Sequence, residues 1–164
     1  GGGIVVRSQL LQGPNAIAGE WGHNPLPWPD RGEWPGPDCY CGRRGCIETF
    51  LSGPGFALDF ARVSGRSLAG PQILAGAEAG DADCEAAFQR YEERLARALA
   101  HVINLLDPDA IVLGGGLSNC GRLYARIPAR WTRHVFSDRV DTRLLPPRYG
   151  DSSGVRGAAW LWGD

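Results

Sequence analysis

The chain has 164 residues, a formal net charge of −1 at pH 7 and 43% hydrophobic residues. This length is typical of one domain with a sizeable core, and the near-balanced charge excludes a strongly basic surface for nucleic acid or anionic membranes. The longest apolar runs, Ile111–Leu113 and Ala158–Trp162, are too short to span a bilayer, and the N-terminus lacks a signal-peptide pattern. We therefore expect a soluble, cytoplasmic protein with no membrane partner and no nucleic-acid binding by this lobe.

The chain begins Gly1-Gly2-Gly3 and contains no Met, so we infer that an upstream part of the protein is absent. Ile4–Val6 and Gln9–Leu11 predict β structure closing in a turn. The segment 25–38 is rich in proline, which excludes a helix or a central strand. We expect an irregular excursion, which needs interactions other than regular secondary structure to hold it in place.

Helical signals begin near Cys46 and continue to Val63, with a break at Gly53-Pro54-Gly55. A long helix is predicted from about Cys84 to Leu106. The apolar stripe of this helix consists of Phe88, Tyr91, Leu95, Ala98, Leu99, Val102, Ile103 and Leu106. Its charged face consists of Arg90, Glu93, Arg94 and Arg97.

The apolar run Ala110–Leu113 predicts a buried strand that ends in three glycines. Ser118 can cap a following helix that runs to about His134. An extended segment at Thr142–Leu145 precedes a last helix, which is capped by Ser152 or Ser153 and continues through Trp162. Strands that alternate with helices indicate an α/β fold.

Three of the five cysteines lie within eight residues, in the pattern C-x-C-G-x-x-G-C at Cys39, Cys41 and Cys46. With His23 upstream they make a complete tetrahedral zinc shell with no open position, which indicates a structural ion. Gly42 and Gly45 supply the positive φ that such a loop needs. The alternatives are free thiols, or one disulfide and a spare thiol, but C-x-C pairs are too tight for an easy disulfide.

Three motifs in this order resemble the ROK family of bacterial sugar kinases and repressors: Glu20-Trp21-Gly22-His23, the run Cys39–Glu48, and Leu113-Gly114-Gly115-Gly116. The segments GEWGHNPLPW, CYCGRRGCIETF and GDSSGVRGAAWLW are similar to the sequences of the family's fructokinase or manno(fructo)kinase branch. The resemblance covers essentially the whole chain.

The resemblance implies a two-lobed fold of the actin and sugar-kinase (ribonuclease H-like) kind, with residues 1–164 as the C-terminal lobe and a zinc-binding segment at about 20–48. It implies that the full-length parent transfers the γ-phosphate of ATP, with magnesium, to fructose or mannose. A homodimer is the implied assembly.

The resemblance also assigns residues. It places structural zinc on His23, Cys39, Cys41 and Cys46, the sugar hydroxyls against Glu20, His23 and Glu48, phosphate near Gly1, Gly2 and Gly3, and adenosine near Gly114, Gly115 and Gly116. The family's catalytic aspartate and its D-x-G-G-T-like phosphate loop match nothing here, and Asp109, Asp138 and Asp151 do not fill that position. We assign no catalytic residue and expect the isolated chain to be inactive.

Other functions stay open from the sequence. The parent could be a sugar-sensing repressor, or a kinase of N-acetylhexosamines or glucose. A zinc-bearing interaction module, with Trp21, Trp28 and Trp34 as its docking surface, is a third class. Glu20 and Glu48 could be solvated surface charges, and Gly1–Gly3 a cloning remnant.

Overall fold

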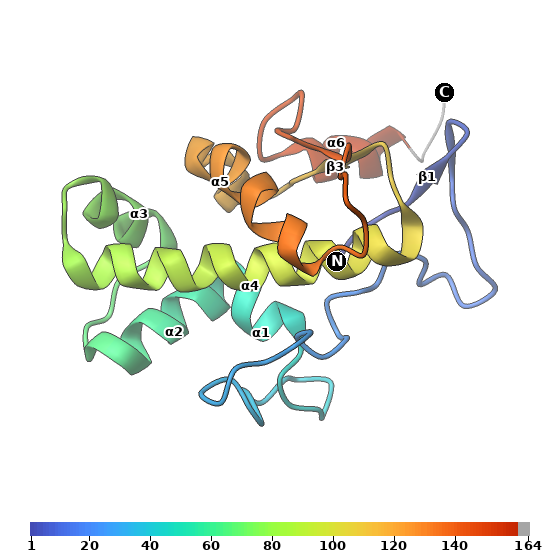
Figure 1. Ribbon diagram of the computed structural model, residues 1–164. Helices are drawn as coiled ribbons and strands as arrows, with labels where there is room; N and C mark the ends of the chain where they lie inside the picture. The colour runs from blue at the N-terminus through green and yellow to red at the C-terminus, as the bar shows by residue number, and fades with distance from the viewer. Residues whose placement is uncertain (161–164) are drawn as a thin grey trace.

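The computed structural model describes residues 1–160 and is organised around one central helix, α4 (Ala82–Leu106) (Figure 1). The helix begins two residues before the predicted Cys84, because the Asp81 side chain caps it by accepting a hydrogen bond from the Cys84 backbone. It ends where predicted, with Asp107 in the left-handed region and Pro108 beyond.

The apolar stripe predicted for α4 is confirmed over most of its length. Val102 is half-buried and Leu106 exposed, so the stripe weakens near the C-terminal end of the helix. The predicted residues that are buried are Phe88, Tyr91, Leu95, Ala98, Leu99 and Ile103.

Three helices that precede α4 in the chain pack against it. Helix α1 (Ile47–Leu51) and helix α2 (Gly53–Ser64) meet at Ser52, which caps α2, so the predicted break is confirmed. Val63, where the predicted helical segment ends, faces solvent. Helix α3 (Gly70–Glu78) was not predicted, because its apolar pattern is short and flanked by glycines.

Across α4 from α1 and α2 lies α5 (Gly121–Trp131), preceded by a 3₁₀ turn at Gly116–Asn119 and followed by another at Thr132–His134 (Figure 1). The predicted cap at Ser118 is wrong: Ser118 is buried inside the first 3₁₀ turn and Cys120 stands before the helix.

The strands occur where they were predicted but are short. The strand predicted at Ala110–Leu113 is not buried, since Val112 is 59% exposed. Strands β1 (Val5–Val6) and β2 (Gln9–Leu10) form an antiparallel hairpin, and β3 (Ala110–Val112) pairs in parallel with β4 (Arg143–Leu145). Helices therefore dominate the described part of this α/β chain. The last helix, α6 (Ser153–Trp160), begins as predicted, and its predicted end at Trp162 lies outside the described residues.

The charged face predicted for α4 is not a solvated face, which corrects the sequence interpretation. Arg94 and Arg97 are each 3% exposed, and both bind Glu33 of the proline-rich excursion at 2.7 and 2.8 Å. Arg94 also pairs with the buried Asp59 of α2 at 3.0 Å. Arg97 further donates to the carbonyl of Trp28. This buried charge network is the anchor that the excursion needs.

Across residues 1–160, no helix is both long and apolar enough to cross a membrane.

Candidate metal centre and ligand site

The four predicted metal ligands lie together. The Sγ atoms of Cys39, Cys41 and Cys46 and one ring nitrogen of His23 are all within 4.8 Å of one another. The Sγ atoms of Cys41 and Cys46 are 3.6 Å apart, and Cys39 Sγ lies 3.5 Å from His23 Nδ1. The cysteines are free thiols, so the disulfide alternative is not what the structure shows.

These separations fit a metal ion. A tetrahedral centre with metal–sulfur bonds of about 2.3 Å places neighbouring ligand atoms roughly 3.5 to 3.8 Å apart. Three thiols and an imidazole are also the donor set that zinc prefers over magnesium or calcium. The cluster is therefore shaped to hold one tetrahedral ion with all four positions filled by protein.

Backbone pairing explains why residues so distant in the chain converge. Residues 22–26 run antiparallel to residues 45–48: the backbone N–H of Leu26 donates to Gly45, that of Ile47 to Asn24 and that of Glu48 to Gly22. This short ladder brings His23 beside Cys46 and Glu48. Cys46 itself stands at the N-terminus of α1, so the helix fixes its sulfur.

Glycines make the remaining turns possible. Gly42 and Gly45 have φ of 84° and 69°, as predicted. At Gly45 the reason is also steric, because a Cβ there would lie 2.9 Å from the carbonyl oxygen of Pro35. The cysteine loop and the proline-rich segment pack backbone against backbone at this point.

The predicted sugar-contacting carboxylates lie on the same side of this ladder. A Cβ built on Gly22 would lie 3.7 Å from the Cβ of Glu48 and 3.8 Å from Oε1 of Glu20. Glu48 Oε1 is also 3.8 Å from His23 Nδ1. The structure thus brings Glu20, His23 and Glu48 around Gly22.

The free nitrogen of His23 is not vacant, which differs from the sequence interpretation. Nε2 lies 2.9 Å from the hydroxyl of Tyr40, and the two rings meet edge to face at 5.0 Å. The pKa of Tyr40 is raised, first by the negative charge of Glu48 and also by Cys39 and Glu20, so the phenol keeps its proton. No pattern in the sequence indicates this role of Tyr40, because any residue can stand between the two cysteines of a C-x-C pair.

The thiols differ in acidity without a metal. The backbone N–H of Arg43 and the neighbouring groups lower the pKa of Cys41 to about 7. Burial raises the pKa of Cys46 to about 12. Since metal ligands bind as thiolates, loading this cluster must release protons.

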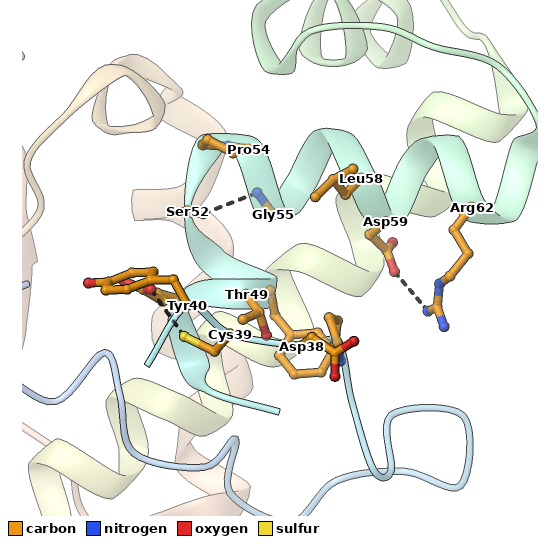
Figure 2. Close-up of a pocket in the computed structure, with 13 residues that line it drawn as sticks. Asp38, Cys39, Tyr40, Thr49, Ser52, Pro54, Gly55, Leu58, Asp59 and Arg62 are labelled. Atoms are coloured by element: carbon orange, nitrogen blue, oxygen red, sulfur yellow. Dashed lines mark hydrogen bonds and ion pairs between the residues drawn. The ribbon is translucent and has the colours of Figure 1, made fainter. Parts of the chain in front are cut away.

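A hollow of about 360 Å³ adjoins the cluster (Figure 2). Figure 2 shows Cys39 and Tyr40 along one side of it, and Pro54 and Leu58 of α2 along another. Glu48 also lines it, so the hollow lies next to the carboxylate that faces His23.

The two predicted nucleotide segments are placed differently. Gly114, Gly115 and Gly116 follow β3, are exposed, and have open space where a side chain would stand. Gly2 of the first segment instead packs tightly, because a Cβ there would lie 2.9 Å from the carbonyl of Gly19. For Gly2, close backbone packing is therefore a sufficient reason for glycine.

A sequence profile for the ROK family matches residues 1–164. The chain belongs to the ROK family. It is 41% identical over 165 residues to an N-acetyl-D-glucosamine kinase of Aliivibrio salmonicida, covering 98% of this chain and 55% of that relative. This ROK chain thus spans about half the length of the curated relatives it matches.

Solved ROK structures agree with the fold. A ROK glucokinase from Streptomyces griseus, determined with glucose and AMPPNP, superposes with a TM-score of 0.81 at 28% identity, over 98% of this chain and 56% of that one. A ROK transcriptional regulator, a homologue of the E. coli MLC protein, gives 0.72 at 28% identity, over 88% of this chain and 38% of that one. The expected α/β fold of the actin and sugar-kinase kind fits these neighbours.

Proposed function

We propose that the complete protein transfers the γ-phosphate of ATP to a hydroxyl of a hexose, and that this ROK chain is the lobe that supplies sugar contacts and a metal-stabilised loop. The observation that carries the proposal is the convergence of Glu20, His23 and Glu48 around Gly22. Two carboxylates can accept hydrogen bonds from the paired hydroxyls of a sugar ring, and an imidazole N–H can donate one.

The proposed sugar is N-acetylglucosamine or glucose, ahead of fructose or mannose. The resemblance of the motifs to fructokinase sequences favoured fructose as the substrate. The kinases named above, however, are an N-acetylglucosamine kinase and a glucokinase. Identity of 41% to the former makes an N-acetylhexosamine the first substrate to test. We rank glucose second.

We assign structural zinc to His23, Cys39, Cys41 and Cys46. When bound, zinc supplies a rigid tetrahedral cross-link and leaves no position for water or substrate. His23 and Glu48 are then aimed by the same cross-link, since one belongs to the cluster and the other lies two residues from Cys46.

We place the adenosine of ATP, with magnesium on its phosphates, against the exposed Gly114–Gly116 loop. Backbone N–H groups there are open to a ligand because no side chain covers them. Gly1 and Gly3 remain candidates for phosphate, with Gly2 held by packing. The catalytic base is proposed to lie outside this chain, and the homodimer stays a prediction.

ADP release by the complete protein tests the proposal, with ATP, magnesium and N-acetylglucosamine, N-acetylmannosamine, glucose, fructose and mannose supplied singly. We expect strong turnover with N-acetylglucosamine or glucose. Turnover with fructose alone would reverse the ranking of sugars. Absence of turnover with every sugar would contradict the kinase.

A sugar-responsive regulator is the second candidate, because the chain also superposes on a ROK transcriptional regulator over 88% of its length. Such a protein would bind a sugar in calorimetry and release no ADP. The two measurements together therefore separate the candidates.

A further inference from the structure

Tyr40 occupies an unusual position for an aromatic residue. It is 85% exposed, yet its neighbours Cys39 and Cys41 both belong to the metal cluster. The backbone turns tightly around it: the N–H of Gly42 donates to Cys39, and the N–H of Cys39 donates to Arg43. A bound metal would hold the sulfurs of both flanking cysteines, so the backbone that carries the Tyr40 ring would be restrained on both sides.

The hydroxyl of Tyr40 reaches back to the ligand site. If His23 Nδ1, the nitrogen beside Cys39 Sγ, binds the metal, Nε2 carries the proton and donates it to Tyr40 Oη across 2.9 Å. Among the described residues this is the only hydrogen bond of the Tyr40 hydroxyl. Its own O–H is therefore free to donate to a ligand.

The surroundings of Tyr40 are those of a sugar contact. Glu48 lines the same hollow as Tyr40, so a carboxylate and a phenol border one space. The imidazole of His23 lies behind both, 3.8 Å from Glu48 Oε1 and 2.9 Å from the Tyr40 hydroxyl. An exposed, rigid aromatic ring offers an apolar face for the C–H surface of a pyranose and a polar tip for one hydroxyl. The hollow beside the ring leaves room for a ligand (Figure 2).

We propose that Tyr40 is an additional substrate-binding residue, which packs its ring on the sugar and donates its hydroxyl proton to a sugar oxygen while holding His23 in the required tautomer. This inference rests on the proposed sugar-kinase function. It predicts that a change of Tyr40 weakens sugar binding without weakening nucleotide binding.

The test uses the complete protein and the variants Tyr40→Phe and Tyr40→Ala, with Trp34→Ala as the matched control. Trp34 is an aromatic residue of the same excursion and is 73% exposed. Three quantities are measured for each protein: zinc per chain, the Kd of the sugar without ATP by calorimetry, and KM for the sugar and for ATP. The sugar is the one that the wild type turns over best.

Tyr40→Phe should raise the Kd and KM of the sugar by roughly threefold to tenfold, the effect of one neutral hydrogen bond. Tyr40→Ala should raise them by roughly a further tenfold, because the ring contact is also lost. Zinc content, KM for ATP and all values of Trp34→Ala should match the wild type.

The outcomes separate the role of Tyr40 from the proposed kinase function. Normal sugar constants in Tyr40→Ala, with an active wild type, would overturn the role of Tyr40 and leave the kinase intact. Loss of zinc in both variants would overturn it too, by making Tyr40 a structural part of the cluster. A wild type that neither binds nor phosphorylates any sugar would overturn the proposed function and this inference with it.

Discussion

Glu33 and Arg97 form a buried, two-point ion pair. Nη2 of Arg97 lies 2.8 Å from both carboxylate oxygens of Glu33, although the two residues are 64 positions apart in the chain. Arg94 binds the same carboxylate, so the proline-rich excursion that begins beside His23 is fastened to the central helix α4. The segment between His23 and Cys39 is thereby attached to α4 by a buried ion-pair network.

Removing this carboxylate should destabilise the protein strongly. Glu33→Ala leaves two buried guanidinium groups without their shared partner, and we expect a loss of about 3–5 kcal/mol in the free energy of unfolding. Urea unfolding of the zinc-loaded protein measures it. Asp141→Ala, which breaks the exposed Arg139–Asp141 pair, is the matched control and should leave the free energy of unfolding nearly unchanged. Equal effects of the two changes would contradict the role of the buried pair.

Acid should weaken the same network. Burial by itself would raise the pKa of Glu33, but hydrogen bonds from Arg94 and Arg97 outweigh burial and lower the pKa below its ordinary value of 4.5. The pKa of Asp59 is likewise lowered below 3.8, because the charges of Arg94 and Arg90 outweigh burial. Since both folded-state pKa values are depressed, the stabilisation is complete above about pH 5 and is lost as pH falls through these values.

The pH effect is measured as the slope of unfolding free energy against pH between about 5 and 3. A zinc ion at the proposed site would also be lost in acid, so the informative quantity is the difference in slope between wild type and Glu33→Gln. The wild type should show the steeper slope. Parallel slopes would show that Glu33 is not a source of the acid sensitivity.

Loss of one cluster ligand should abolish zinc binding. His23→Ala and Cys41→Ser each leave three ligands, so we expect less than about one tenth of the wild-type zinc content and a lower melting temperature. Elemental analysis after dialysis measures the metal. Cys120→Ser changes a cysteine outside the cluster and should keep about one zinc per chain. Full zinc content in both ligand variants would refute the assignment.

The carboxylates should act on sugar binding and not on the metal. Glu20→Gln and Glu48→Gln each replace a charged hydrogen-bond acceptor, which corresponds to a rise of roughly tenfold to a hundredfold in KM for the sugar. Zinc content should stay at the wild-type level, because neither residue belongs to the four-ligand group. An unchanged KM for the sugar in both variants would remove these residues from the site.

A change in the glycine loop after β3 should weaken nucleotide binding without weakening sugar binding. A side chain at Gly114 meets nothing within 4 Å, so Gly114→Val should fold normally and still obstruct a ligand that approaches the backbone. We expect KM for ATP to rise by roughly tenfold, with KM for the sugar unchanged. Gly32→Val, also in open space but in the excursion, is the control. A normal KM for ATP in Gly114→Val would place the nucleotide elsewhere.

Local patterns in the sequence determined a large part of this structure. The apolar repeat of α4, the stop at Asp107-Pro108 and the positive φ of Gly42 and Gly45 follow from helix periodicity and backbone sterics, which act over a few residues. The convergence of the four proposed metal ligands was also predictable, because the spacing of Cys39, Cys41 and Cys46 is typical of a zinc site. These features need no knowledge of distant contacts.

Tertiary structure alone decided the rest. A charged residue on a helix looks the same in sequence whether water or a carboxylate faces it, so the burial of Arg94 and Arg97 against Glu33 could not be predicted. The contact between Tyr40 and His23 likewise depends on how the loop folds back across 17 positions. Backbone sterics and helix periodicity depend on neighbouring residues, so a sequence pattern can predict them. The partners of buried charges and exposed rings depend on which distant segments pack together, so only the tertiary structure determines them.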